Sequence, residues 1–176
     1  MAIDTEPLLF LPIAPNYFLA LKDGPDTFRK TFAYSAADGL RNFIVSGDVS
    51  PETVASLNET SDFDPWRWGF FIVHKPTLQT IGMAGFKGPP NAEGIVEIAY
   101  AIVPSFENNG YATIAAKHLV QFAHNDSRVQ LVCAHTLPTS NASTRVLEKT
   151  GFRQIGTIED PDDGTIWRWQ HDNPVG

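Results

Sequence analysis

Cysteine and long apolar runs are both scarce in this sequence. A single cysteine among 176 residues excludes an internal disulfide and suits a reducing compartment. The apolar stretch PLLFLPIAP is too short to span a bilayer and lacks the basic flank of a signal peptide. We therefore expect a cytoplasmic protein that is not embedded in a membrane.

Positive charge is also in short supply. The chain has 13 lysine and arginine residues against 20 acidic residues, which gives a formal net charge of -7 at pH 7. Without a basic cluster there is no electrostatic footprint for nucleic acid, so a cationic partner is expected instead. The hydrophobic fraction of 43% and the charged fraction of 19% are typical of a globular protein, and the length fits one domain over residues 1–176.

Hydrophobic periodicity predicts the order of the elements. Strands are predicted by aromatic or β-branched runs at residues 6–13, 69–75, 80–88, 94–103, 129–136, 152–158 and 164–170. Helices are predicted at two places within 16–43, and at 50–58, 110–124 and 140–151. Residues 61–68, SDFDPWRW, are expected to form an exposed loop. Since early strands pair in hairpins and later ones flank helices, the sequence predicts an α+β sandwich on a mixed, largely antiparallel sheet.

A polar, flexible turn precedes the helix predicted at 110–124. The first backbone N–H groups of a helix lack internal partners, and with the helix dipole they form an anion site. Asn108, Asn109 and Gly110 let the turn form tightly and leave its backbone open to a group such as a pyrophosphate. The same residues also fit a plain helix start, in which Asn109 caps the helix and Gly110 relieves strain. The stretch by itself leaves both interpretations open.

The strand before that turn has two unlike faces. Alternation places Glu97, Ala99, Ala101 and Val103 on one face and bulky side chains on the other. The first face has room for a thin ligand that runs along the strand toward the helix start. An equally good interpretation is that the two alanines let a helix pack closely and that Glu97 sits at an exposed edge.

Strand, turn and helix together resemble the acetyl-coenzyme A site of the GNAT superfamily of N-acetyltransferases. The family signature is Q/R-x-x-G-x-G/A, and the stretch ENNGYA matches it at Gly110 and Ala112. Glu107 stands at the first position, where the family prefers glutamine or arginine. A carboxylate there suits a bound pyrophosphate only if its side chain points to solvent.

A second stretch resembles one branch of the same superfamily. SNASTRVLEKTGF is similar to the pattern N-x-x-S-x-x-V-L-E-K-x-G-F of the RimJ/RimL-like branch, which acetylates protein N-termini and various small amines. The serine of the pattern is Ser143, and the asparagine position holds Ser140, with Asn141 one place later. The similarity covers residues 69–170 well and the first 68 residues only by the order of their elements.

This resemblance implies a GNAT-type fold, a three-layer α/β/α sandwich, and transfer of an acetyl group from acetyl-CoA to a primary amine. The acceptor would be a protein N-terminus or a small molecule, and no metal would be needed. The positions that the resemblance assigns to coenzyme binding are Ala101, Ile102, Val103, Asn108, Asn109, Gly110, Tyr111, Ala112, Thr113, Asn141 and Ser143.

Two side chains are candidates for the chemistry. Glu97 is expected to help remove the proton of the acceptor amine, directly or through water, because it lies on the strand beside which the family binds its thioester. Many relatives protonate the leaving thiolate with a tyrosine, but that position holds Leu147. Ser143 is then the nearest hydroxyl for the departing sulfur. Its plain alternative is a small side chain packed near a helix start.

Other polar side chains have plain interpretations. Cys133 and His135 share a strand face, and with no further cysteine we favour core packing over a zinc site. His118 and His124 are expected at the surface because their spacing does not align them for a metal.

The acceptor and the oligomeric state are left open by the sequence. Trp66 and Trp68 fit either an acceptor site, with neighbouring aspartates attracting a cation, or a cover for the sheet. Exposed strand edges in such a sandwich are compatible with a homodimer. Glu107 and the missing tyrosine also fit a different class of protein, a sensor or scaffold that binds the coenzyme without turnover.

Overall fold

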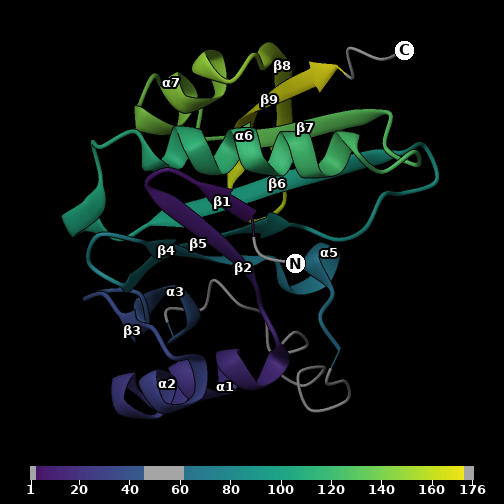
Figure 1. The fold of residues 1–176 in the computed structure, drawn as a ribbon. Helices are drawn as coiled ribbons and strands as arrows, with labels where there is room; N and C mark the ends of the chain where they lie inside the picture. Colours follow the sequence, from purple (N-terminus) through teal and green to yellow (C-terminus); the bar gives the residue numbers. More distant parts are fainter. Residues whose placement is uncertain (1–2, 46–61, 173–176) are drawn as a thin grey trace. The chain divides into compact units, whose positions relative to one another are not determined.

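A computed structural model of the chain describes residues 3–45 and 62–172 (Figure 1). The helix expected at 50–58 lies outside these residues. The chain forms two compact units, and each is described by itself. The first unit contains residues 1–85 and 100–111, and the second contains residues 86–99 and 112–176. Among the described residues, no helix combines the length and apolar character that crossing a bilayer requires.

The first unit is built on an antiparallel set of strands. Hydrogen-bonded neighbours follow the order β1 (Ile3–Thr5), β2 (Leu8–Pro12), β4 (Phe70–His74) and β5 (Gln79–Phe86). The short β3 (Ser35–Ala36) pairs with β5 in parallel. The C-terminal part of β6 (Ile95–Ile102) adds to β5, and just beyond it the N–H of Val103 donates to the carbonyl of Ile81 at 2.9 Å. The predicted hairpin of β4 and β5 is confirmed.

Two short helices pack side by side in this unit, as the sequence predicted. They are α1 (Pro15–Asp23) and α2 (Pro25–Phe32), and each begins with a proline, whose fixed φ suits the first helical position (Figure 1). Gly24 separates them with a φ of 145°, which side chains with a Cβ rarely adopt. Aromatic rings fill the core beneath, where Phe28 and Phe71 meet edge to face with centroids 5.3 Å apart. A third helix, α3, covers Asn42–Val45.

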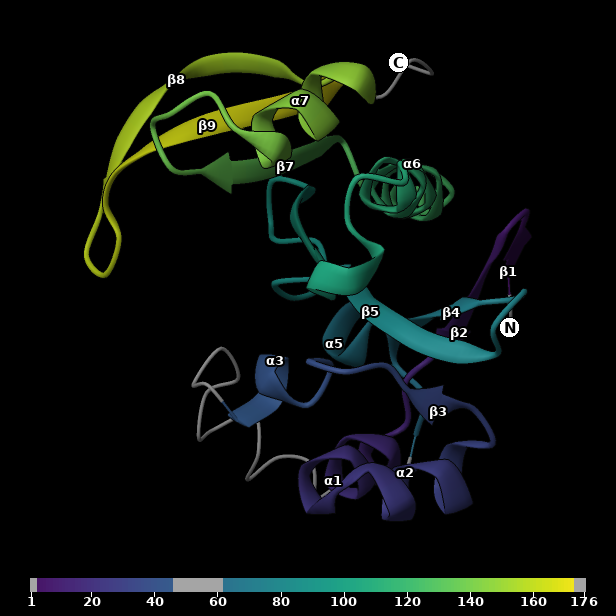
Figure 2. The same cartoon turned by 90° about the vertical axis from the view of Figure 1, so that its left-hand side faces the viewer.

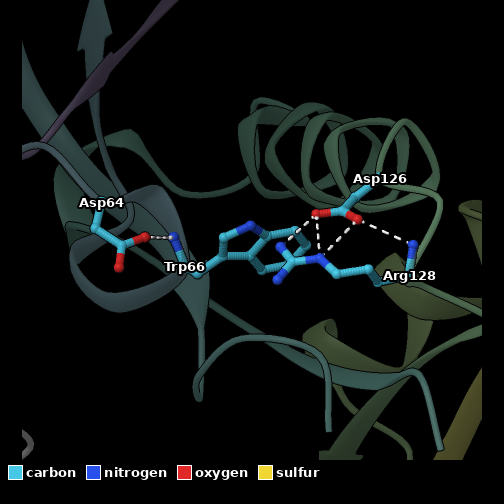
Figure 3. A network of polar contacts seen from close by, with 4 residues as sticks. All are labelled: Asp64, Trp66, Asp126 and Arg128. Atoms are coloured by element: carbon cyan, nitrogen blue, oxygen red, sulfur yellow. Dashed lines mark hydrogen bonds and ion pairs between the residues drawn. The ribbon is translucent and has the colours of Figure 1, made fainter. Parts of the chain in front are cut away.

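The predicted exposed loop at 61–68 is only partly a loop. Residues Pro65–Trp68 form the helix α5, and the Asp64 carboxylate caps it by accepting the N–H of Trp66 at 3.0 Å (Figure 3). Trp68 is buried and packs against Phe18, with ring centroids 6.3 Å apart. For Trp68, burial in the core favours the interpretation as a cover for the sheet over a place in an acceptor site. An aspartate directly before a proline is a helix-start signal, so this short helix is readable from the sequence.

The second unit joins parallel and antiparallel pairs. The N-terminal part of β6 pairs in parallel with β7 (Leu131–Thr136), β7 pairs antiparallel with β9 (Gly164–Asp172), and β9 with β8 (Arg153–Asp160). The two helices assigned mainly to this unit are α6 (Tyr111–His124) and α7 (Ala142–Lys149), and Figure 2 looks along the axis of α6. These pairings confirm the prediction of a mixed, largely antiparallel sheet.

One face of this part of the sheet is covered by helix. His124 on α6 hydrogen-bonds His171 at 3.1 Å, and His171 shares a face of β9 with the buried Trp169. Val132 and Ala134 of β7 are buried as well. The opposite face presents polar residues, and we call it the polar face. It is formed by Glu97, Cys133, His135, Arg168 and Gln170.

The expectation that His118 lies at the surface is wrong, whereas His124 is partly exposed. His118 is 4% exposed, because it shares a helical face with the fully buried Ala115 and Leu119. Burial lowers the pKa of His118 to about 4. His124 is half-buried, and its pKa is lowered by burial and by the neighbouring His171.

An ion pair ties the turn that follows α6. The Asp126 carboxylate accepts the backbone N–H of Arg128 at 3.0 Å and its Nη2 at 2.6 Å (Figure 3). These hydrogen bonds, the side-chain ones first, lower the pKa of Asp126. The turn leads directly into the β7 strand.

Candidate functional site

The turn before α6 is exposed and has a left-handed backbone. Pro104 ends β6 and opens a single turn of 3-10 helix, η1 (Pro104–Phe106). Residues 107–110 follow, all exposed, with φ values of 61° at Asn108 and 80° at Gly110. Asparagine and glycine are the residues that tolerate this conformation best. The sequence therefore places them where the chain must turn sharply into a helix.

Asn109 stabilises the turn rather than the helix. Its Nδ2 donates to the carbonyl of Phe106 at 3.1 Å and to that of Glu107 at 2.9 Å. The helix begins at Tyr111, so Gly110 holds the cap position that the plain interpretation gave to Asn109. Glu107 is exposed, which meets the condition stated for a carboxylate beside a pyrophosphate. Ala112 and Thr113 lie in the first turn of α6 and are half-buried.

Hydrogen bonds between three side chains of the first unit anchor Tyr111, the first residue of α6. The hydroxyl of Tyr111 lies 3.0 Å from Nε2 of His74, and Nδ1 of His74 lies 2.9 Å from Oγ1 of Thr77. The ring of Phe106 packs edge-on against His74, at a centroid distance of 5.2 Å. Sequence reasoning missed this contact, because 37 residues separate the tyrosine from the histidine and no local pattern links them.

At the end of β6, the groups that could bind a ligand are backbone N–H groups rather than side chains. Ile102 and Val103 are buried, and Ala101 is half-buried. The N–H of Val103 is already donated to Ile81, so it cannot serve an oxyanion. Because successive N–H groups of a strand point to opposite sides, the N–H of Ile102 points away from β5. Of the predicted backbone donors in this segment, Ile102 therefore fits a ligand better than Val103.

Glu97 lies in a small charged cluster on the polar face. Its Oε1 is 2.8 Å from Nζ of Lys87 and 2.9 Å from Nδ1 of His135. Cys133 is its register partner on β7. The thiol of Cys133 is buried, and burial, followed by the charge of Glu97, raises its pKa to about 11. Core packing holds for Cys133, but His135 faces the carboxylate, a pairing that the sequence analysis did not predict.

The parallel ladder of β6 and β7 is short. It runs from the pair Ile95 and Leu131 to the pair Glu97 and Cys133, whereas β7 continues to Thr136. Glu97 therefore stands at the last rung of the ladder, and His135 stands two residues beyond it on the neighbouring strand. Their side chains share the polar face, since residues two apart on a strand point the same way.

The start of α7 is closed by a reciprocal cap. The Asn141 Oδ1 accepts the N–H of Thr144 at 3.1 Å, and Oγ1 of Thr144 accepts the N–H of Asn141 at 2.9 Å. Ser143 lies between them and is half-buried. Leu147, at the position where many relatives carry tyrosine, is 1% exposed and belongs to the core. Asn141 thus has a structural role that the resemblance did not suggest.

Two basic side chains of α7, one turn apart, face solvent. Arg145 and Lys149 are exposed on α7, in line with a solvated helix face. Within residues 3–45 and 62–172, no group of three or more histidine, cysteine, aspartate or glutamate side chains is arranged to hold a metal ion.

Residues 23–153 match the family described as the acetyltransferase (GNAT) domain. The uncharacterized N-acetyltransferase YjdG of Bacillus subtilis (strain 168) is 33% identical over 101 residues, which is 57% of this chain and 58% of that protein. YoaA of the same organism, also named an uncharacterized N-acetyltransferase, is 29% identical over 92 residues, 52% of this chain and 51% of that protein. The chain therefore spans a little over half the length of these relatives.

Two solved structures share the fold over nearly the whole chain. The GNAT acetyltransferase of Bacillus anthracis has a TM-score of 0.64 at 19% identity and covers 98% of this chain and 99% of its own. RimL, a ribosomal L7/L12 alpha-N-protein acetyltransferase solved with coenzyme A, has a TM-score of 0.68 at 12% identity and 100% coverage of both chains. At these identities the likeness shows the fold, a mixed, largely antiparallel sheet flanked by helices.

Proposed function

Because the chain belongs to the acetyltransferase (GNAT) domain family, we propose that it is an acetyl-CoA-dependent N-acetyltransferase acting on a primary amine. The structural observation that carries this proposal is the exposed turn of residues 107–110, with left-handed backbone at Asn108 and Gly110, directly before the 14-residue helix α6. Such a helix start presents several backbone N–H groups and a positive dipole end to an anion.

The coenzyme would be held mainly by backbone. In this proposal the pyrophosphate binds the N–H groups of residues 108–112, and Thr113 completes the first helical turn. The exposed side chain of Glu107 stays in solvent, away from the phosphate charges. The pantetheine arm would bind the backbone N–H of Ile102, which points away from β5, with Ala101 beside it on the same strand. Tyr111 contributes its backbone N–H, while its side chain anchors the helix start through His74.

Deprotonation of the acceptor is the chemical step that the protein must assist. A lysine-like amine has a reference pKa of about 10.4 and an α-amino group one of about 8, so most of either acceptor is protonated at pH 7. Glu97 is half-buried at the end of the β6 and β7 ladder, and we assign it to this step, acting through a neighbouring group or water.

The leaving thiolate also needs a proton or a hydrogen bond. Leu147 cannot supply one, since it is apolar and buried. Ser143 lies in the first turn of α7 and is only half-buried, so we propose that its hydroxyl donates to the departing sulfur. Asn141 would support this role chiefly by fixing the start of α7 through its cap.

The acceptor is proposed at the level of its class. An acidic chain favours a cationic acceptor, and a primary amine of a small molecule or of a protein N-terminus satisfies this. RimL, which shares the fold, is named for acetylating a ribosomal protein N-terminus. Cytoplasmic location, a single domain over 1–176 and the possibility of a homodimer belong to the same proposal.

One observation favours a second candidate, a coenzyme-binding sensor or scaffold. The position at which many relatives carry a catalytic tyrosine is closed inside the core as Leu147. Turnover separates the two candidates. Incubation with acetyl-CoA and a panel of polyamines, amino acids and N-terminal peptides, followed by mass spectrometry, should show an acetylated product for at least one member. Binding of acetyl-CoA without any product would instead support the sensor.

Variants at the two assigned side chains test the mechanism itself. Glu97→Gln should lower kcat by at least about 10-fold, because assistance by a general base is typically worth about 100- to 10,000-fold. Ser143→Ala should lower kcat with little change in the KM for the amine. Full turnover in both variants would remove these two residues from the mechanism.

A further inference from the structure

The polar face of the second unit holds a carboxylate and an imidazole in direct contact. Nδ1 of His135 lies 2.9 Å from Oε1 of Glu97, and the two side chains are only 16% and 21% exposed. An ionised carboxylate can only accept hydrogen bonds, so Nδ1 must carry the hydrogen. In a neutral imidazole the other nitrogen, Nε2, then carries the lone pair.

The two groups differ in how far they are already engaged. Oε1 of Glu97 is bonded both to His135 and to Nζ of Lys87, at 2.8 Å. Nε2 of His135, by contrast, is buried and has no hydrogen-bond partner within the part of the chain that the structure describes. A buried polar atom without a partner is costly, and at functional sites it is often completed by a substrate or by water.

We propose that His135 is the group that accepts the proton of the acceptor ammonium, and that Glu97 is its positioning residue. This inference rests on the proposed acetyltransferase function and assigns the proton transfer within it. An imidazole is better matched than a carboxylate to exchange protons near pH 7. The carboxylate fixes the tautomer and stabilises the positive ring that forms, the arrangement that a buried acid and histidine adopt in hydrolytic triads.

The proton and electron pairs are fully accounted for in this step. The ammonium passes one proton through one water to Nε2 of His135, since that nitrogen is buried, and the freed lone pair of the amine forms the C–N bond at the thioester carbonyl. The C–S bond then breaks, and its electron pair leaves with the sulfur. The new amide nitrogen gives up one further proton, which the thiolate takes up, and His135 returns the first proton to solvent.

Charges of both signs surround the imidazole. Glu97 lies against it, and Arg168 is its register partner on β9. Lys87 reaches the same carboxylate, and Cys133 shares the strand face. Asp160 at the end of β8 is also near, since His135 and Lys87 make minor contributions to the lowered pKa of Asp160, after hydrogen bonds from its own turn. Glu97 is the group in direct contact, so its removal should change the behaviour of His135 most.

The kinetic test compares pH profiles of His135→Gln, Glu97→Gln and the wild type, with His124→Gln as the control histidine on α6. In the wild type, kcat/KM should fall at acid pH as one group is protonated. His135→Gln should lower kcat by about 100- to 10,000-fold and abolish that acid limb, with the KM for acetyl-CoA unchanged. Glu97→Gln should shift the limb to lower pH, because the imidazolium loses its counter-charge. His124→Gln should keep the wild-type profile.

Two outcomes would overturn the assignment. If His135→Gln retains the wild-type rate and acid limb while Glu97→Gln loses both, the carboxylate itself is the base. If the wild type binds acetyl-CoA but acetylates no amine, the proposed function fails and takes this inference with it, which distinguishes the two failures.

A second measurement does not depend on turnover. Nitrogen-15 NMR of the histidine rings at pH 8 should show His135 as the tautomer protonated at Nδ1, and Glu97→Gln should alter the Nδ1 signal. Protonation of His135 at Nε2 in the wild type would contradict the assignment whatever the activity.

Discussion

Burial of His118 makes the free energy of unfolding depend on pH. The folded-state pKa is lowered to about 4, whereas an unfolded histidine titrates near 6.5. Between these two pKa values, the unfolded chain therefore binds a proton at His118 and the folded chain does not. The contribution of His118 to the free energy of unfolding therefore has its full value above about pH 6.5. It decreases by up to about 3 kcal/mol as the pH falls toward 4.

His118→Gln should remove most of this pH dependence. Glutamine has no charge to gain, so urea unfolding of the variant should give a flatter stability between pH 6.5 and pH 4.5 than the wild type does. At about pH 7.5 histidine is neutral in both the folded and the unfolded state. The difference in unfolding free energy between the wild type and His118→Gln at that pH therefore measures only the packing cost of the substitution. Equal slopes in the two proteins would contradict the account of a buried neutral histidine.

At the scale of elements, variants at the start of α7 distinguish two roles of Asn141, capping of the helix and binding of the coenzyme. Its Oδ1 caps the helix, and loss of such a cap typically costs about 0.5–2 kcal/mol. Asn141→Ala should lower the free energy of unfolding by about 1 kcal/mol in urea titration. Asn141→Asp is the matched variant, because aspartate caps as well as asparagine does and keeps the stability.

The same two variants report on the coenzyme. If the asparagine acts only through the cap, Asn141→Asp should bind acetyl-CoA as the wild type does. Loss of binding with full stability in Asn141→Asp would show instead that the amide itself contacts the coenzyme, or that an added negative charge is not tolerated there. Asn141→Gly, a weaker cap without either group, distinguishes these two cases.

Most elements could be predicted from the sequence, because their signals are local. Hydrophobic periodicity predicted two helices within 16–43, where α1 and α2 lie, and aromatic or β-branched runs predicted the β4 and β5 hairpin and the β8 and β9 hairpin. The turn before α6 was also readable from Asn108 and Gly110. The helix α5 was missed even though Asp64 and Pro65 announce it.

The contacts that the sequence could not predict are long-range. Glu97 and His135 lie on different strands, and their meeting depends on the register of β6 against β7. Tyr111 and His74 are joined by the fold alone. The burial of His118 was a different kind of error, since its spacing from Ala115 and Leu119 places it on the apolar face of α6. Helical periodicity, rather than the spacing of the histidines, predicts the burial of His118.

At the scale of the whole molecule, we propose that residues 1–176 form one domain, and a single domain of this size unfolds in one cooperative transition. The division into two compact units falls within elements, since β6 contributes residues 95–99 to one unit and 100–102 to the other. The strand β6 thus belongs to both units. We therefore expect a single heat-absorption peak, with equal calorimetric and van't Hoff enthalpies.

Two resolved transitions in the same scan would contradict a single domain. Near-ultraviolet circular dichroism and tryptophan fluorescence provide the check, because the four tryptophans fall in both units. Coincident melting by both probes is the expected result.

Acetyl-CoA at 100 times its dissociation constant should stabilise the folded chain by about 2.7 kcal/mol and raise the melting temperature.

The most direct test of the central claim is calorimetric titration of acetyl-CoA into the wild type, Gly110→Asn and Gly110→Pro. Gly110 has a φ of 80°, which asparagine tolerates and proline forbids. We expect saturable binding of one coenzyme per chain, retained in Gly110→Asn and lost in Gly110→Pro, with all three proteins folded by circular dichroism. Absence of binding in the folded wild type would contradict the claim that this chain uses acetyl-CoA.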